Sequence, residues 1–176
     1  MASSAALSSR FGSNMPEQWT NDSVRALERA SIRSFMERSR PYLQGRILDF
    51  GSGKQPYRDL VLGEYVPIDQ GDVWPVATEA FACIVCNQVL QYIEDPAKLL
   101  DNFHAWLCAR RGCLVMTYPT NWDEVEGTDL WRFTKAGMEL LLKRSRFEIL
   151  IHERRAEIDL HGFKFPLGYG VVARAY

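Results

Sequence analysis

The residues with the clearest chemical potential lie in the stretch LDFGSG, where Asp49 precedes Gly51 and Gly53. Glycine has no Cβ, so a turn that contains two glycines lets the backbone come close to a ligand. Asp69 follows another apolar run further along the chain. A carboxylate at the end of such a strand can accept hydrogen bonds from both hydroxyls of a ribose. The pattern therefore predicts a site for a ligand that contains a ribose.

The carboxylate of Asp49 restricts what else this ligand can carry. It would repel a pyrophosphate at the glycine turn, so the sequence disfavours a nicotinamide dinucleotide and a dehydrogenase function. It would attract a cationic group, such as the ammonium of an amino acid. Ammonium, ribose and adenine occur together in S-adenosylmethionine, which these residues favour as the ligand.

The elements that must position these residues alternate between strand and helix. Apolar runs predict strands at 45–50, 63–69, 81–87, 112–118, 147–153 and 168–175. Helical spacing predicts helices at 22–42, 95–108 and 134–147. Alternation requires crossovers and indicates a parallel sheet, whereas the last two strands, with no helix between them, predict an antiparallel pair. We expect a three-layer α/β sandwich with a mostly parallel, doubly wound sheet whose last strand runs against the rest.

Two connections between predicted strands allow further predictions about the sheet. Residues 70–80 separate Asp69 from the strand at 81–87 and are too few to hold both a helix and a further strand. We therefore expect the sheet to be abbreviated at that edge. Gly162, Pro166 and Gly168 are predicted to lie in the connection between the last two strands.

Composition excludes several classes of protein. The chain has 176 residues, which predicts one domain over 21–176 behind a disordered tail at 1–20, with a transit peptide as the alternative for the tail. The formal net charge is -1. The charge balance gives no excess of positive charge that would attract nucleic acid. No apolar run approaches the roughly 20 residues of a membrane helix, so we expect a cytoplasmic protein without a membrane partner. Cys83 and Cys86 have the spacing of a redox or zinc motif, but in a strand they point to opposite faces, so we expect buried thiols and no metal site.

Five longer stretches carry a resemblance to a known family: ILDFGSGKQPY, YVPID, FACIVCNQVLQYIEDPAKLL, GCLVMTYPTN and DLWRFTKAGMELLL. Together they resemble class I S-adenosylmethionine-dependent methyltransferases, which have a Rossmann-like fold, of the type that acts on small molecules, natural products and polysaccharides. Gln55-Pro56 stands where the family has its third glycine. The resemblance implies an enzyme that transfers a methyl group to an oxygen or nitrogen of a small-molecule acceptor, with S-adenosylmethionine as its cofactor.

The resemblance also implies which residues bind the cofactor. The glycine turn would surround the methionine end, the end of the second strand would hold the ribose and adenine, and the end of the strand at 81–87 would line the sulfonium. These residues are Asp49, Gly51, Ser52, Gly53, Asp69, Gln70, Asp72, Val73, Asn87 and Gln88. Trp74 is a further candidate for a wall of the adenine site.

Candidate acceptor contacts lie mainly after the strand at 112–118, on the rim where an acceptor must meet the methyl group. The candidates are Tyr92, Tyr118, Asn121, Trp122, Asp129, Arg132 and His161. Asp129 and Arg132 could orient or deprotonate an acceptor, or they could form a structural ion pair that holds this segment to the next helix. The sequence names no general base, and it leaves the catalytic residues and the oligomeric state open.

One alternative function remains open at this point. A methyltransferase-like domain without catalysis could serve as a binding module or scaffold. The absent third glycine and the shortened sheet edge are compatible with that alternative, and so is the small size of the chain.

Overall fold

The computed structural model describes residues 21–75, 80–109, 111–121, 127–160 and 162–176. The strands are β1 (Gln44–Phe50), β2 (Leu62–Ile68), β3 (Cys83–Asn87), β4 (Cys113–Pro119), β5 (Phe147–Leu160) and β6 (Phe163–Ala175). The helices are α2 (Asn21–Arg38), α3 (Pro96–Cys108) and α4 (Lys135–Arg144). Three short 3-10 turns join them: η1 (Arg40–Tyr42), η2 (Arg58–Leu60) and η3 (Leu90–Tyr92).

The six strands form one mixed sheet in the order β2-β1-β3-β4-β6-β5. The pairs among β1, β2, β3 and β4 are parallel, whereas β6 runs antiparallel to both β4 and β5. The predicted doubly wound sheet with a reversed last strand is therefore confirmed. Within the described residues β2 ends the sheet on one side, which confirms the abbreviated edge.

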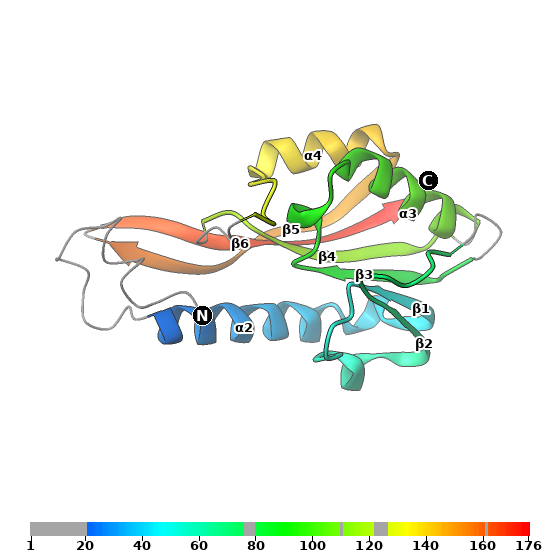
Figure 1. The fold of residues 1–176 in the computed structure, drawn as a ribbon, viewed down its shortest axis with the longest axis horizontal. Helices are drawn as coiled ribbons and strands as arrows, with labels where there is room; N and C mark the ends of the chain where they lie inside the picture. Colours follow the sequence, from blue (N-terminus) through cyan, green and yellow to red (C-terminus); the bar gives the residue numbers. More distant parts are fainter. Residues whose placement is uncertain (1–20, 76–79, 110, 122–126, 161) are drawn as a thin grey trace.

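Helices cover both faces of the sheet. Figure 1 shows α3 and α4 on one side and α2 on the other. Successive side chains in a strand point to opposite faces, so each central strand serves both layers. Leu48 packs in the core under α3 and α4, whereas its neighbour Ile47 packs in the core under α2. Both cores are fully apolar at these positions, as expected for a sheet buried on two sides.

The helix ends follow the predicted signals, with one difference. The side chains of Asp95 and Thr134 each accept a hydrogen bond from a backbone amide in the first turn of α3 and α4. The first helix was predicted to reach Tyr42, but α2 ends at Arg38 and the chain continues as the 3-10 turn η1. Pro41 within that turn cannot extend an α-helix.

The last two strands are longer than predicted, and the prediction that Pro166 and Gly168 lie in a connection is wrong. Both residues belong to β6, where they pair with Glu157 and Arg155 of β5. Pairing of β6 with β4 stops at Gly168, so Pro166 has a strand neighbour on one side only. Because no second strand pairs with Pro166, the absence of an N–H group on proline removes no hydrogen bond to such a strand.

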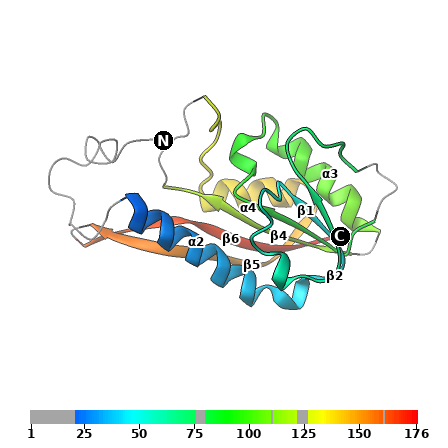
Figure 2. The same cartoon turned by 60° about the horizontal axis from the view of Figure 1, so that its bottom comes forward.

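The extended hairpin of β5 and β6 projects beyond the rest of the sheet, and α2 lies along it (Figures 1 and 2). An ion pair between Arg38 and Glu153 joins helix and hairpin at their surface. Across the described part of the chain, every helix is too short or too polar to cross a bilayer.

Candidate active site

The glycine turn is fixed by backbone geometry. After β1 ends at Phe50, the amides of Gly51 and Ser52 both donate to the carbonyl oxygen of Ile68, at 2.9 and 3.0 Å. Gly51 has a φ of +75°, and a Cβ at this position would overlap the side chain of Val89. Only glycine combines this conformation with this close approach. The turn therefore joins the ends of three neighbouring strands at one point.

A cavity of about 810 Å³ opens beside this turn, at the carboxyl ends of the parallel strands. Its volume lies within the roughly 300–1,000 Å³ that is usual for small-molecule sites. Ligands of open α/β sheets bind at this edge. The predicted site residues that line the cavity are Gly51, Asp69, Gln70, Asn87, Gln88 and Tyr92. These predicted residues come from the ends of three strands and from the turn after β3, and the fold brings them together at the cavity.

Asp69 presents its carboxylate at the rim of the cavity. Its Oδ1 accepts a hydrogen bond from the amide of Gln70 at 2.9 Å, and its own amide donates to Oδ2 of Asp72 at 2.7 Å. Asp72 is turned back onto this loop, and neither it nor Val73, which is 90% exposed, lines the cavity. The ring of Trp74 lines it instead and contacts Phe50 edge-on at 5.2 Å.

Asp49 lies beneath the turn and does not line the cavity. Its side chain is buried, with 4% exposed, and Oδ2 accepts a hydrogen bond from the hydroxyl of Tyr65. Burial raises the pKa of Asp49 to about 6, although the Tyr65 hydrogen bond opposes this, and the charge of Asp69 adds to it. Ser52 is buried, Gly53 is exposed with a φ of +49°, and neither lines the cavity.

Asn87 and Gln88 connect the end of β3 to the neighbouring elements. The hydroxyl of Thr117 donates to Oδ1 of Asn87 at 3.0 Å and accepts from Nε2 of Gln88 at 3.1 Å. Asn87 also contacts the sulfur of Met36 on α2 through Nδ2, at 3.3 Å. Gln88 has a φ of +57°, which is unusual for a residue other than glycine and occurs often at functional sites. The cavity edge is therefore tied to β4 and to α2.

The predicted acceptor residues occupy different environments. Tyr92 is exposed and lines the cavity. Tyr118 is fully buried instead, with its ring stacked on Tyr169 at 5.6 Å and its hydroxyl 2.7 Å from Nε2 of His152. It lies in the core because β4 continues to Pro119 and directs this side chain beneath α4 rather than into the rim.

Two further candidates lie on the loops. Asn121 is exposed and donates a hydrogen bond through Nδ2 to the carbonyl of Pro166 at 3.0 Å, so it joins the end of β4 to the hairpin. Trp122 and His161 lie outside the described residues.

Asp129 and Arg132 form the predicted pair, with Nη2 of Arg132 2.5 Å from Oδ2 of Asp129. The carboxylate side chain is buried and the guanidinium is mostly so. Neither residue lines the cavity, but neighbouring residues of the same segment do. The amide of Leu130 donates a hydrogen bond to the carbonyl of Gln91 at 2.8 Å, which holds this segment in place. The lining residues of this segment are Gly127, Thr128 and Leu130.

Sequence reasoning missed several lining residues that follow predicted ones directly. Val89, Ile93 and Glu94 continue the chain after Gln88, and each lines the cavity. Their signal was positional, because most residues between the end of β3 and the start of α3 line the cavity, whereas Leu90 and Gln91 are buried. Phe50 and Ile68, the last residues of β1 and β2, were missed because they read as core positions.

The fold is an α/β sandwich with a mixed sheet and a cavity at the carboxyl ends of its parallel strands. Residues 13–148 match the family model described as a methyltransferase domain, and the chain belongs to that family. S-adenosylmethionine is the cofactor that this membership implies. The site fits it, because the Gly51 turn leaves no room for a Cβ and Asp69 offers a carboxylate at the cavity rim.

Solved structures agree with this fold. A methyltransferase from Mesorhizobium loti superposes with a TM-score of 0.63 at 17% identity, covering 84% of this chain and 99% of the other. One from Aquifex aeolicus gives 0.61 at 12% identity, covering 88% and 98%. Magnesium protoporphyrin IX methyltransferase from Synechocystis, with bound S-adenosylhomocysteine, gives 0.55 at 11% identity, covering 87% of each chain. No curated protein sequence matches the chain.

Proposed function

We propose that this methyltransferase transfers the methyl group of S-adenosylmethionine to an oxygen or nitrogen of a small-molecule acceptor. The observation that carries the proposal is the single cavity lined both by predicted cofactor residues and by Tyr92 and Leu130, which have no expected part in cofactor binding. One space can therefore hold the two reactants together. Proximity and alignment are the main needs of a displacement whose leaving group is already activated.

The residues around the cavity support distinct tasks. Asp69 is suited to hold the ribose, the Gly51 turn to approach the methionine end, and Trp74 to cover an apolar ring. When bound, the cofactor supplies an electrophilic methyl carbon on a sulfonium. The segment that contains Gly127 and Leu130 lies at the rim, where an acceptor must enter.

A small acceptor fits the character of this rim better than a macromolecule does. Tyr92, Leu130 and Trp131 are exposed apolar side chains near the cavity. Trp131 is held in place by a hydrogen bond from its indole nitrogen to the carbonyl of Ile93, at 2.8 Å. The net charge of -1 provides no electrostatic attraction for nucleic acid. An apolar or aromatic small molecule is the acceptor class that these walls favour.

Titration calorimetry with S-adenosylhomocysteine and with NAD tests the cofactor half of the proposal. We expect S-adenosylhomocysteine to bind and NAD to bind weakly or not at all, because the carboxylate of Asp49 beneath the glycine turn disfavours a pyrophosphate. A higher affinity for NAD than for S-adenosylhomocysteine would refute the proposal.

Turnover with candidate acceptors tests the other half. Formation of S-adenosylhomocysteine from S-adenosylmethionine is followed with hydroxyl- and amine-bearing small molecules. Acceptor-dependent product supports the proposed transfer. Cofactor binding without turnover of any acceptor would favour the alternative of a binding or scaffold domain.

A further inference from the structure

The charged residues that line the cavity are acidic. Among the residues that the structure describes, Asp69 and Glu94 line it, and no lysine, arginine or histidine does. The stretches next to these lining residues that lie outside the described part, 76–79 and 122–126, contain no lysine or arginine in their sequence. A space lined by carboxylates favours a cationic ligand and disfavours an anionic one.

The two carboxylates belong to different parts of the cavity. Asp69 follows β2, in the turn proposed to hold the ribose, whereas Glu94 lies in the connection from β3 to α3. Tyr92, a candidate acceptor contact, comes two residues before Glu94 and lines the same cavity. When the ribose hydroxyls occupy Asp69, Glu94 is the charged lining residue left for a second molecule.

The connection that holds Glu94 is joined to the rim proposed for the acceptor. The amide of Leu130 donates to the carbonyl of Gln91 at 2.8 Å. The indole nitrogen of Trp131 donates to the carbonyl of Ile93, also at 2.8 Å. Both hydrogen bonds attach the acceptor rim to residues that come shortly before Glu94, so this carboxylate lies beside the entrance proposed for the acceptor.

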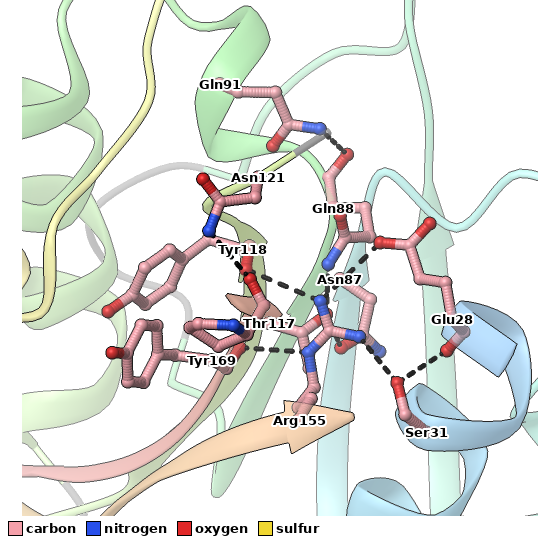
Figure 3. Close-up of polar contacts among 11 residues, drawn as sticks. Glu28, Ser31, Asn87, Gln88, Gln91, Thr117, Tyr118, Asn121, Arg155 and Tyr169 are labelled. Carbon is pink, nitrogen blue, oxygen red and sulfur yellow. Dashed lines mark hydrogen bonds and ion pairs between the residues drawn. The ribbon is translucent and has the colours of Figure 1, made fainter. Parts of the chain in front are cut away.

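The backbone on both sides of Glu94 is fixed. Nε2 of the buried Gln91 donates to the carbonyl of Gln88 at 2.9 Å, which holds the turn after β3 (Figure 3). On the other side, Oδ1 of Asp95 accepts from the amide of Lys98 at 3.0 Å and caps α3. Glu94 itself is exposed, and no basic side chain of the described part of the chain pairs with it. Its carboxylate is therefore available to a ligand.

Apolar and aromatic side chains lie on the same rim. Tyr92 and Leu130 line the cavity and are 42% and 50% exposed. The face of an aromatic ring attracts a cation, and this attraction adds to that of a nearby carboxylate. A carboxylate beside such side chains suits an ammonium group on an apolar or aromatic body.

We propose that Glu94 determines the class of acceptor by binding the ammonium group of an aromatic or apolar amine, an inference that rests on the proposed methyl transfer. The ammonium donates a charge-assisted hydrogen bond to the Glu94 carboxylate. Tyr92 and Leu130 contact the body of the acceptor. A protonated amine has no electron pair that could attack the methyl carbon, so the ammonium serves recognition and a different oxygen or nitrogen receives the methyl group.

Three molecules with the same indole ring and two-carbon linker test this charge preference without turnover. Tryptamine ends in an ammonium, tryptophol in a neutral hydroxyl and indole-3-propionate in a carboxylate. Equilibrium dialysis measures their binding to the protein saturated with S-adenosylhomocysteine, which has no methyl group to transfer. We expect tryptamine to bind about fivefold more tightly than tryptophol, and indole-3-propionate to bind most weakly. Added salt should reduce these differences because it screens the charge at the rim.

Two variants assign the preference to Glu94. Glu94→Gln should remove the advantage of tryptamine and leave tryptophol within about twofold of wild type. Glu94→Lys should reverse the order, so that indole-3-propionate binds more tightly than tryptamine. Both variants should bind S-adenosylhomocysteine within about twofold of wild type.

Glu148→Gln is the matched control and should change none of these affinities. Glu148 is an exposed glutamate of β5 that aligns with Arg174 of β6, and Arg174 aligns with Cys113, the first residue of β4. The control therefore removes a glutamate at the edge of the sheet opposite the cavity.

The outcomes separate this inference from the proposed function. If wild type does not bind S-adenosylhomocysteine, the proposed function fails and the inference fails with it. If it does, but tryptamine is not the tightest of the three, or none of them binds at millimolar concentration, only the role of Glu94 is overturned. A Glu94→Gln protein that loses S-adenosylhomocysteine and tryptamine equally would make Glu94 a cofactor contact. Equal loss of all three indoles would refute recognition by charge.

Discussion

The turns on the proposed cofactor side of the cavity and the junction between α2 and the hairpin of β5 and β6 are held in place in different ways. On the cofactor side, the turns after β1 and β2 are fixed by backbone hydrogen bonds, such as those from Gly51 and Ser52 to Ile68. At the junction of α2 with the hairpin, the contacts are made by side chains from distant parts of the chain, among them a buried ion pair between Arg155 and Glu28. Arg155 reaches Ser31, which lies 124 residues earlier, and α2 meets the hairpin through it.

This difference explains which residue types each region accepts and how far each region can be predicted from the sequence. A backbone turn restricts residue type at each position, because a positive φ and a close approach leave only glycine. A cluster of side chains requires a particular combination of residues, and each residue of the combination is common at other places in a sequence. No single position therefore predicts the cluster. The turn beside the cavity can therefore be recognised in a short stretch of sequence, whereas the junction of α2 with the hairpin can be recognised only in the fold.

The largest expected effect comes from breaking the junction of α2 with the hairpin at the ion pair of Arg155 and Glu28. Arg155→Met should lower the free energy of unfolding by about 3–5 kcal/mol, because it removes one partner of a buried ion pair and leaves Glu28 uncompensated. Chemical denaturation measures this. Arg154→Met is the matched control: its pair with Glu157 is exposed, and we expect a loss below about 1 kcal/mol. Equal losses in the two variants would show that the buried ion pair does not hold the hairpin to α2.

The fold could be predicted largely because its signals are local. Alternating apolar runs and helical spacing gave the order of the elements, and the absence of a helix between the last two strands gave the antiparallel pair. The length of the hairpin could not be predicted. Residues 154–167 contain charges, Gly162 and Pro166, which resemble a loop until α2 is known to lie along them.

The site divides in the same way. Asp69 was predicted from its position at the end of a strand, whereas Gln70, Asn87 and Gln88 were implied by the family resemblance, and all four line the cavity. The packing of Tyr118 into the core was not predicted, because the direction of a side chain at a strand end depends on where pairing stops. At the junction of α2 with the hairpin, Glu28 and Arg155 carry no spacing signal, since one is on a helix and the other on a strand far along the chain.

The next effect tests the cofactor side. Asp69→Ala should weaken S-adenosylhomocysteine binding by about 2–4 kcal/mol, since each hydrogen bond from a ribose hydroxyl to the carboxylate contributes roughly 1.5–3 kcal/mol and the two are not additive. Calorimetry gives the affinity, and thermal unfolding should be little changed because the side chain is exposed. Asp101→Ala, an exposed aspartate on α3, is the control. A folded Asp69→Ala protein with wild-type affinity would remove Asp69 from the site.

A smaller effect is expected for the segment that contains Leu130 at the rim of the cavity. Arg132→Ala frees Asp129 from its ion pair and loosens the segment that lines the cavity at Leu130. If the pair shapes the acceptor site, turnover should fall by about tenfold, or ~1.4 kcal/mol, while S-adenosylhomocysteine affinity stays nearly constant. Turnover per folded molecule is the decisive quantity. A loss that only follows the folded fraction would assign the pair a purely structural role.

The smallest expected effect concerns the protonation of Asp49 beneath the glycine turn. A cationic ammonium above the turn favours the ionised carboxylate, so binding lowers the pKa of Asp49 from its value of about 6 in the free protein. Binding therefore releases a proton, and S-adenosylhomocysteine affinity should rise about three- to tenfold between pH about 5 and about 7.5. Because the folded pKa lies above the unfolded one, the free protein should also lose stability as pH rises from about 4 to about 6.

Two variants decide whether this dependence belongs to Asp49. Asp49→Asn has no charge to gain, so its affinity should be low at both pH values and nearly independent of pH. Tyr65→Phe removes the hydrogen bond that favours the ionised form. The midpoint of the affinity curve should then move to higher pH, because an ionised carboxylate without that donor is less stable. A pH dependence that survives in Asp49→Asn would place the titrating group elsewhere and leave the glycine turn to act through its backbone alone.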